Sequence, residues 1–197
     1  MGAGDAAARV APSARDTRAA RTHPTAPAIG TAPAELERSG RRRQDGGVGE
    51  IGVVSDTHGL VRPELLAALD GVVHVLHAGD VGSAEVLAAL GQIAPVTAVR
   101  GNNDRGPWAA TLPAAITVTL AGVRIHLLHD RKELTAVPDV AVVVAGHSHR
   151  PGVAEHDGVL FLNPGSAGPR RFRLPVTMAR LALTDGVPAV RIVSLIT

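Results

Sequence analysis

The hydrophobic pattern of this chain is a series of short apolar runs that each end in a cluster of polar residues. The runs are rich in Val, Ile, Leu and Ala, which is typical of strands buried on both faces of a sheet. Open α/β sheets present their ligands at the carboxyl ends of the strands, so we expect the polar clusters to converge at one edge. Five such units span residues 51–59, 72–80, 96–104, 125–130 and 140–149.

Helices separate the first three runs, whose second and third strands are predicted over 72–78 and 96–100. The pattern predicts helices over residues 63–70 and 83–90. Proline is suited to the first turn of the former helix, and the serine that opens the latter is a candidate cap. The resulting strand–helix–strand–helix–strand unit should have right-handed crossovers and three parallel strands.

Hairpins dominate the second half of the chain. Paired apolar runs joined by Ala-Gly, Asp-Gly or Thr-Asp-Gly are predicted at residues 115–128, 152–162 and 176–195. Between them we expect a short helix over 131–137 and a buried strand over 140–145. Parallel units combined with hairpins indicate an α/β fold, with one mixed sheet or two stacked sheets and helices outside.

Composition changes sharply near the start of the first strand. Residues 1–48 are rich in Ala, Arg and Pro and contain almost no large apolar side chains, which predicts a disordered tail. Residues 49–197 carry the alternating apolar pattern and are long enough to form one folded domain. We assign the tail no function.

Charge and composition exclude several classes of protein. The net charge of +2 divides into +3 for residues 1–49 and −1 for residues 50–197, and only three residues are aromatic. A near-neutral domain without stacking platforms argues against nucleic-acid binding, with a basic binding arm in the tail as the alternative. The chain has no cysteine and no apolar run of membrane-spanning length, so we expect a cytoplasmic protein without a membrane partner.

Seven side chains in the polar clusters are candidate metal ligands. Oxygen and imidazole donors without sulfur suit Mn²⁺, our first choice, and also Zn²⁺, Fe or Ni²⁺. Seven ligands are too many for one ion and fit two that share a carboxylate, for which Asp80 is the natural bridge. Two metals roughly 3.5–4 Å apart would lower the pKa of a bound water and stabilise a phosphoryl transition state. The candidates are Asp56, His58, Asp80, Asn102, His129, His147 and His149.

From Gly49 onward the chain resembles the calcineurin-like metallophosphoesterases. The order Asp-x-His, Gly-Asp, Gly-Asn-x-Asp, a lone strand-end His, and Gly-His-x-His matches the family pattern in residues 56–149. The later Asn163-Pro-Gly-Ser166, followed by Pro169-Arg170, is typical of the small bacterial and archaeal phosphodiesterases of that superfamily.

The resemblance implies a fold, an activity and a distribution of ligands. The fold would be a four-layer αββα sandwich, with two mixed β-sheets flanked by helices. The activity would be hydrolysis of phosphodiesters, and also of monoesters, by a metal-bridging hydroxide. One metal would be held by Asp56, His58 and His149, the other by Asn102, His129 and His147, with Asp80 shared.

Two positions depart from the family pattern. Asn103 stands where many members have His and the subgroup often has Cys, and an amide cannot act as a general acid near neutral pH. We therefore expect slow turnover of esters with poor leaving groups. Asp130 stands where the family usually has Gly, and it would either orient His129 or repel an anionic substrate.

Three residues near the ligands are candidates for catalytic roles, namely Asn103, Asp104 and His77. His77 would support the ligands from behind, and simple packing within its strand is the alternative. Arg170 and Arg171 would bind substrate phosphate, with a solvated loop charge as the alternative.

Simpler interpretations exist for the same residues. Asp56, Asp80 and Asn102 are also typical turn formers at strand ends. His147 and His149 lie two apart, which places them on one side of an extended segment. The rival function is a catalytically weak or inactive relative that serves as a scaffold for a protein partner. The main hypothesis instead takes a small phosphate ester as partner, and it leaves a homo-oligomer open.

Overall fold

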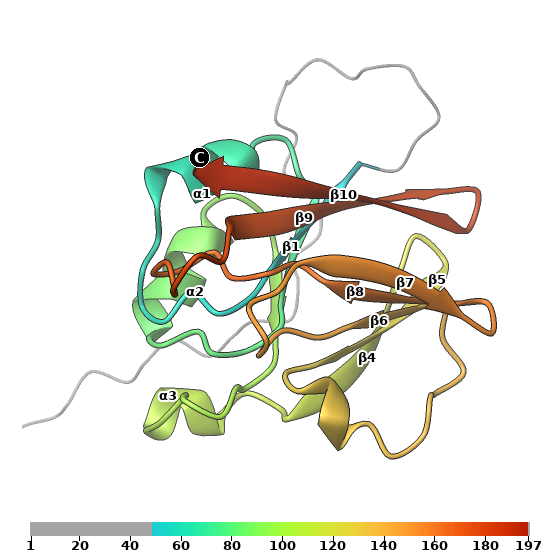
Figure 1. Cartoon of the computed structure of the whole chain (residues 1–197), viewed down its shortest axis with the longest axis horizontal. Helices are drawn as coiled ribbons and strands as arrows, with labels where there is room; N and C mark the ends of the chain where they lie inside the picture. The colour runs from blue at the N-terminus through green and yellow to red at the C-terminus, as the bar shows by residue number, and fades with distance from the viewer. Residues whose placement is uncertain (1–48, 197) are drawn as a thin grey trace, which may run out of the picture. The chain divides into compact units, whose positions relative to one another are not determined.

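The computed structural model describes residues 49–196, which form two five-stranded β-sheets accompanied by short helices (Figure 1). The predicted disordered tail, residues 1–48, lies outside the described residues. Within 49–196, no helix has the length and apolar character needed to cross a lipid bilayer.

The first sheet contains the predicted parallel unit and the last hairpin. Its strands are β1 (Ile51–Val54), β2 (His74–His77), β3 (Val96–Ala98), β9 (Val176–Thr184) and β10 (Val187–Ile196). Their order is β10-β9-β1-β2-β3, in which β1, β2 and β3 are parallel and the β9–β10 hairpin is antiparallel to β1. The prediction of parallel strands is therefore confirmed.

The second sheet is built from the other two hairpins and the buried strand between them. Its strands are β4 (Ala115–Leu120), β5 (Val123–Leu128), β6 (Val142–Val144), β7 (Gly152–His156) and β8 (Val159–Asn163). The order is β4-β5-β6-β8-β7, with β5, β6 and β8 parallel and the outer strands antiparallel. Both sheets are mixed, as the sandwich prediction requires.

The two sheets face each other across an apolar core. The alternation of strand side chains places Val53 and Leu181 of the first sheet against Ile125 and Val144 of the second, and all four are fully buried. This packing fixes the two sheets relative to each other, and it brings the ends of their parallel strands together at one edge.

Helices cover the other face of the first sheet. They are α1 (Pro63–Ala68), α2 (Ala84–Gly91) and the short α3 (Pro107–Ala110), whose Trp108 packs against the same apolar cluster as Leu65 and Leu90. The sequence analysis missed α3, because four residues are too few to show helical periodicity. Ser83 precedes α2 as predicted, but its side chain makes no capping hydrogen bond.

The outer face of the second sheet is covered differently from the prediction. The helix expected over 131–137 is a single 3-10 turn, η1 (Arg131–Glu133), and Leu134 is already extended. Val137 precedes a proline, which disfavours a helical backbone, and it is β-branched. The fourth layer of the sandwich is therefore mainly a loop, which leaves part of this face open.

Candidate metal centre

The five polar clusters meet where the parallel strands of both sheets end. Backbone hydrogen bonds join the loops that follow the strands: Asp56 donates to the carbonyl of Gly79 (3.0 Å), and His58 donates to that of Asp80 (3.0 Å). In the second sheet Gly146 donates to the carbonyl of His129 at 3.0 Å. The loops thus support one another, and their side chains are held in one place.

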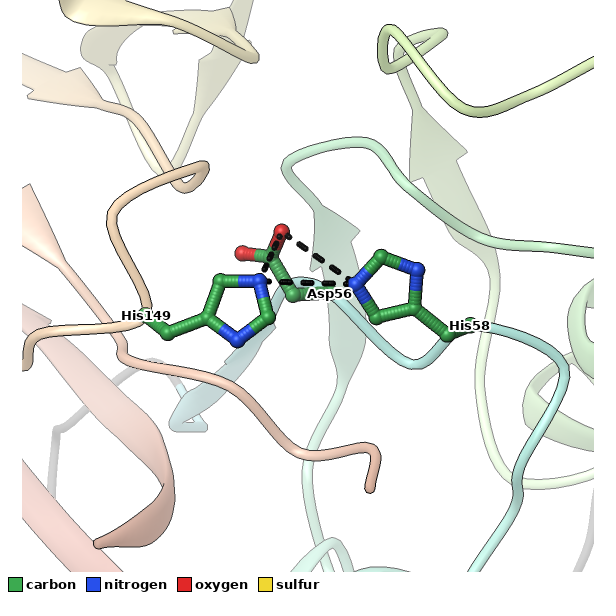
Figure 2. Close-up of side chains that lie close together, drawn as sticks. All are labelled: Asp56, His58 and His149. Atoms are coloured by element: carbon green, nitrogen blue, oxygen red, sulfur yellow. Dashed lines mark hydrogen bonds and ion pairs between the residues drawn. The ribbon is translucent and has the colours of Figure 1, made fainter. Parts of the chain in front are cut away.

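Asp56, His58 and His149 form the first group of ligand atoms, and their side chains point toward one another (Figure 2). The Nε2 atoms of the two histidines lie 3.4 Å apart. Asp56 Oδ1 lies 3.2 Å from His149 Nε2 and 4.0 Å from His58 Nε2. The three candidate ligand atoms therefore surround a common point.

The second group is centred on His129. Asn102 Oδ1 lies 3.0 Å from His129 Nε2 and 3.1 Å from His147 Nδ1, and these two ring nitrogens are 3.3 Å apart. His129 Nδ1 is 2.7 Å from the carbonyl of Ala78, to which it donates, so Nε2 is the nitrogen left to bind a cation. The structure brings these residues together as the sequence predicted.

Asp80 lies between the two groups. Its Oδ2 is 3.9 Å from His58 Nε2 of the first group and 3.4 Å from His129 Nε2 of the second. Carboxylate oxygens of Asp56 and Asp80 also lie within 4.8 Å of a ring nitrogen of His129 and of each other. Asp80 is therefore within about 4 Å of a ring nitrogen from each group.

The backbone at the ligands is strained. Asp56, His58, Asp80, His147 and His149 all have positive φ, between 47° and 65°. The left-handed conformation is uncommon for residues other than glycine, and it tends to occur at functional sites. The expected extended segment at His147 and His149 is therefore wrong: a turn sends the two rings to different groups.

Two glycines permit the close approach of the ligand loops. A Cβ atom on Gly101 would collide with the backbone and carboxylate of Asp80, and one on Gly146 would collide with the hydroxyl of Ser55. The glycines in the Gly-Asn and Gly-His motifs are thus needed for space.

The electrostatics of the site keep the shared carboxylate ionised. Burial acts to raise the pKa of Asp80, but hydrogen bonds from His129 and Asn103 outweigh it and hold that pKa far below its usual range. Burial likewise acts to lower the pKa of His129, yet its hydrogen bonds to Asp80 and to the Ala78 carbonyl raise it to about 9. A cation entering this group would therefore displace a proton from His129.

The donor atoms fit divalent metal ions. Asp56 Oδ2 accepts hydrogen bonds from Ser55 Oγ (2.7 Å) and from the backbone of His147 (3.0 Å). Its other oxygen, Oδ1, is buried and accepts none among residues 49–196, although His149 Nε2 is close by. An unsatisfied buried carboxylate oxygen that faces two imidazoles is suited to a cation such as Mn²⁺ or Zn²⁺.

The candidate catalytic residues lie around the ligands. Asn103 donates to both oxygens of Asp80, from its backbone at 2.8 Å and from its side chain at 2.5 Å. Asp104 accepts hydrogen bonds from the backbone of Val81 (3.2 Å), Gly82 (2.8 Å) and Gly101 (2.8 Å). Asp104 therefore holds the second and third ligand loops together.

His77 is fully buried and bonds to Thr57 Oγ1 at 2.9 Å. It supports the loop that carries Asp56 and His58, and its ring is absent from both groups of ligand atoms. Burial lowers the pKa of His77 to about 4, so the ring is neutral at pH 7.

Asp130 contacts a different histidine from the one expected. Its Oδ2 lies 3.6 Å from His147 Nε2, and its Oδ1 accepts from the backbone of Lys132 at 3.0 Å. His129 uses the Ala78 carbonyl instead. Of the two alternatives for Asp130, orientation of His129 is therefore wrong, and repulsion of an anionic substrate is left as a prediction.

The sequence analysis missed two residues that support Asp56. These are Ser55, which bonds to its carboxylate, and Ser166, whose hydroxyl donates to its backbone carbonyl at 3.0 Å. Ser166 belongs to the Asn163-Pro-Gly-Ser166 motif, and Asn163 donates to the carbonyl of Gly146 at 2.7 Å. The motif was the available signal for Ser166, and the structure places it beside the candidate ligands.

A two-sheet sandwich with carboxylate, amide and imidazole groups gathered at its strand ends has the features of a metal-binding protein. The calcineurin-like phosphoesterase superfamily domain matches residues 50–186, so the chain belongs to this superfamily. The resemblance found in the sequence is thereby confirmed, and with it the general class of metal-binding hydrolase.

Individual relatives agree with this assignment. A protein of Methanothermobacter thermautotrophicus named "Probable metallophosphoesterase" is 34% identical over 143 residues, which cover 65% of this chain and 83% of the relative. A solved archaeal phosphodiesterase has a TM-score of 0.59 at 23% identity, covering 73% of this chain and 99% of that one. Vps29 from Cryptosporidium parvum has a TM-score of 0.60 at 24% identity, covering 76% and 98% respectively. At these identities the two solved structures show a shared fold.

Proposed function

We propose that this protein hydrolyses phosphodiesters, and also monoesters, at a pair of divalent metal ions. The observation that carries the proposal is the placement of Asp80 Oδ2 between the two groups of ligand atoms, 3.9 Å from His58 and 3.4 Å from His129. A single shared carboxylate between two sets of donors is the arrangement that a two-metal site needs.

In this proposal each of the two groups of ligand atoms would hold one metal ion. Asp56, His58 and His149 would hold one ion, and Asn102, His129 and His147 the other. The ions would supply a water of lowered pKa as nucleophile and positive charge against the phosphoryl oxygens. Mn²⁺ is our first choice because the donors include no sulfur, and Zn²⁺, Fe and Ni²⁺ also suit them.

The surrounding residues would act mainly by positioning the ligands. Asn103 orients Asp80 through two hydrogen bonds, and its amide has no acidic proton to give a leaving group. Asp104 and His77 hold the ligand loops in place, so we assign them positioning roles instead of contact with substrate. The substrate would be a small phosphate ester, and a cytoplasmic location remains a prediction.

A scaffold function is the second candidate, and the similarity to Vps29 proteins favours it. Those proteins share the fold, with a TM-score of 0.60 for the Cryptosporidium example. A scaffold would use its surface to bind a protein partner and would not require turnover. Retention of all seven candidate ligands argues for catalysis.

The two functions are separated by activity measured on the full-length protein with added Mn²⁺. Wild type should cleave bis(p-nitrophenyl) phosphate, and Asp80→Asn should reduce kcat by at least about a hundredfold because the shared charge is lost. Asp139→Asn is the matched control, since Asp139 is a surface carboxylate paired with Arg124. If wild type and Asp80→Asn are equally inactive with every metal tried, the scaffold function is correct.

A further inference from the structure

A groove of about 880 Å³ opens beside the metal centre on the outer face of the second sheet. It runs from His147 across β6, β8 and β7, under the η1 turn. The segment after Asp130 forms a single 3-10 turn, and Arg131 and Lys132 of this turn line the groove. Its volume is in the range of pockets that bind small organic ligands.

The floor of the groove is apolar and its rim is basic. Val143, Phe161 and Ala154 come from three neighbouring strands, are paired side by side in the sheet, and form the floor. Arg131 stacks on Phe161, with its guanidinium carbon 4.1 Å from the ring centroid. An apolar floor suits a flat organic group, and basic side chains at the edge suit an anion.

The positive charge of the groove is not neutralised by the described part of the chain. Arg131, Lys132 and Arg150 line it, and none of the three forms an ion pair within residues 49–196. The one acidic residue of the lining is Asp130, which is already engaged by His147 and by the backbone of Lys132. The excess of cations therefore remains available to a ligand.

The groove is continuous with the metal centre. His147 is a member of both, and its half-exposed ring has one nitrogen toward Asn102 and the other toward Asp130. Asn163 also lines the groove and bonds to Gly146, the residue before His147. A molecule bound in the groove would therefore contact His147, one of the candidate ligands.

We propose that the groove binds one ester arm of the substrate, and that this arm is a nucleoside carrying a second phosphate. The base and sugar would lie on the apolar floor, and the second phosphate would bind Lys132 and Arg150. The inference rests on the proposed phosphodiesterase function and narrows its substrate to nucleotide diesters. A p-nitrophenyl ester alone would leave most of the groove empty.

Two chromogenic diesters test the inference with the full-length, Mn²⁺-loaded protein. They are p-nitrophenyl thymidine 5′-phosphate and the same compound with an added 3′-phosphate, which share one leaving group. In wild type the 3′-phosphate should raise kcat/KM by about tenfold, mainly through KM, as expected for one charge-assisted contact. In Lys132→Gln and in Arg150→Gln, the ratio of kcat/KM between the two diesters should fall most of the way to one.

Arg191→Gln is the matched control, because Arg191 is an exposed arginine on β10 and outside the groove lining. It should leave the ratio unchanged. A ratio near one in wild type, or an equal loss of the ratio in Arg191→Gln, would overturn the inference while leaving the phosphodiesterase function in place.

A binding measurement separates failure of the groove from failure of the enzyme. Lys132 is the only lysine of the chain, so its acetylation is followed without interference from other lysines. Thymidine 3′,5′-bisphosphate should protect Lys132 from acetylation by about tenfold at saturation, whereas thymidine should protect it little. If Lys132 is protected but neither diester is cleaved, the groove binds nucleotides and the hydrolase proposal fails. If thymidine 3′,5′-bisphosphate does not protect Lys132, the proposal that the groove binds a nucleotide is overturned.

Discussion

The buried ring of His77 allows a quantitative test of the support beneath the metal centre. The hydroxyl of Thr57 donates to the carbonyl of Val81 at 2.9 Å, so its oxygen accepts from His77 Nε2 at 2.9 Å. The other ring nitrogen, Nδ1, is buried and has no hydrogen-bond partner among residues 49–196. Protonation of His77 would therefore place a charged N–H group in a buried site without a hydrogen-bond acceptor.

The size of the stability loss at low pH follows from the pKa of His77 in the folded and in the unfolded chain. Burial lowers the pKa of His77 from 6.5 to about 4, against the opposing fields of Asp56 and Asp104. Because the unfolded chain binds the proton more tightly, the contribution to stability is fully present above pH 6.5 and is lost as the pH falls toward 4. Between pH 7 and pH 5 this linkage should remove about 2 kcal/mol from the free energy of unfolding.

The assay is urea unfolding of the metal-free protein, with a chelator present, at pH 7 and at pH 5. His77→Gln keeps a donor toward Thr57 and cannot titrate, so its free energy of unfolding should fall about 2 kcal/mol less than that of wild type. His156→Gln, at an exposed position on β7, is the matched control and should behave like wild type. Equal pH dependence in wild type and His77→Gln would refute the reasoning.

Two further substitutions test residues that touch the ligands. Asn103→His should raise kcat by about a hundredfold for diesters with alkyl leaving groups, because imidazolium can protonate a poor leaving group. The increase should be much smaller for bis(p-nitrophenyl) phosphate. An equal change in kcat for both substrates would contradict this. Asp104→Asn should weaken Mn²⁺ binding by about tenfold in calorimetry, since an amide cannot accept the backbone hydrogen bonds from Gly82 and Gly101 on both atoms. Unchanged Mn²⁺ affinity would show that Asp104 does not hold the ligand loops.

Much of the fold and the ligand set was predictable because both depend on local pattern. The β-branched run at Ile51–Val54 and the hairpin around Gly122 are determined by neighbours in sequence. The candidate ligands were readable because each lies within a few residues of the end of a strand, and parallel strands end at the same edge. His129 had only its position at a strand end to mark it, and it proves to be buried at the centre of the second group.

The errors fall where a contact depends on the path of a loop. Asp130 pairs with His147, which is 17 positions later in the chain, and this contact depends on how the loop after β5 crosses β6. The helical pattern after Asp130 looked continuous, yet the backbone leaves the helical conformation at Leu134. Tertiary packing, which local pattern does not report, decides both outcomes.

The same loop connects the ligand set to the choice of substrate. Ligand identity is constrained by the chemistry of the metals and is therefore repeated in recognisable motifs. The groove beside the candidate metal centre is lined in part by the segment that follows Asp130, which here is short of helix and supplies Arg131 and Lys132. We therefore expect the residues at the strand ends to determine the reaction, and the segment between β5 and β6 to determine which substrate is preferred. Replacing residues 130–139 with a different sequence should then change the ratio of kcat/KM between the two thymidine diesters. The altered protein should still bind Mn²⁺.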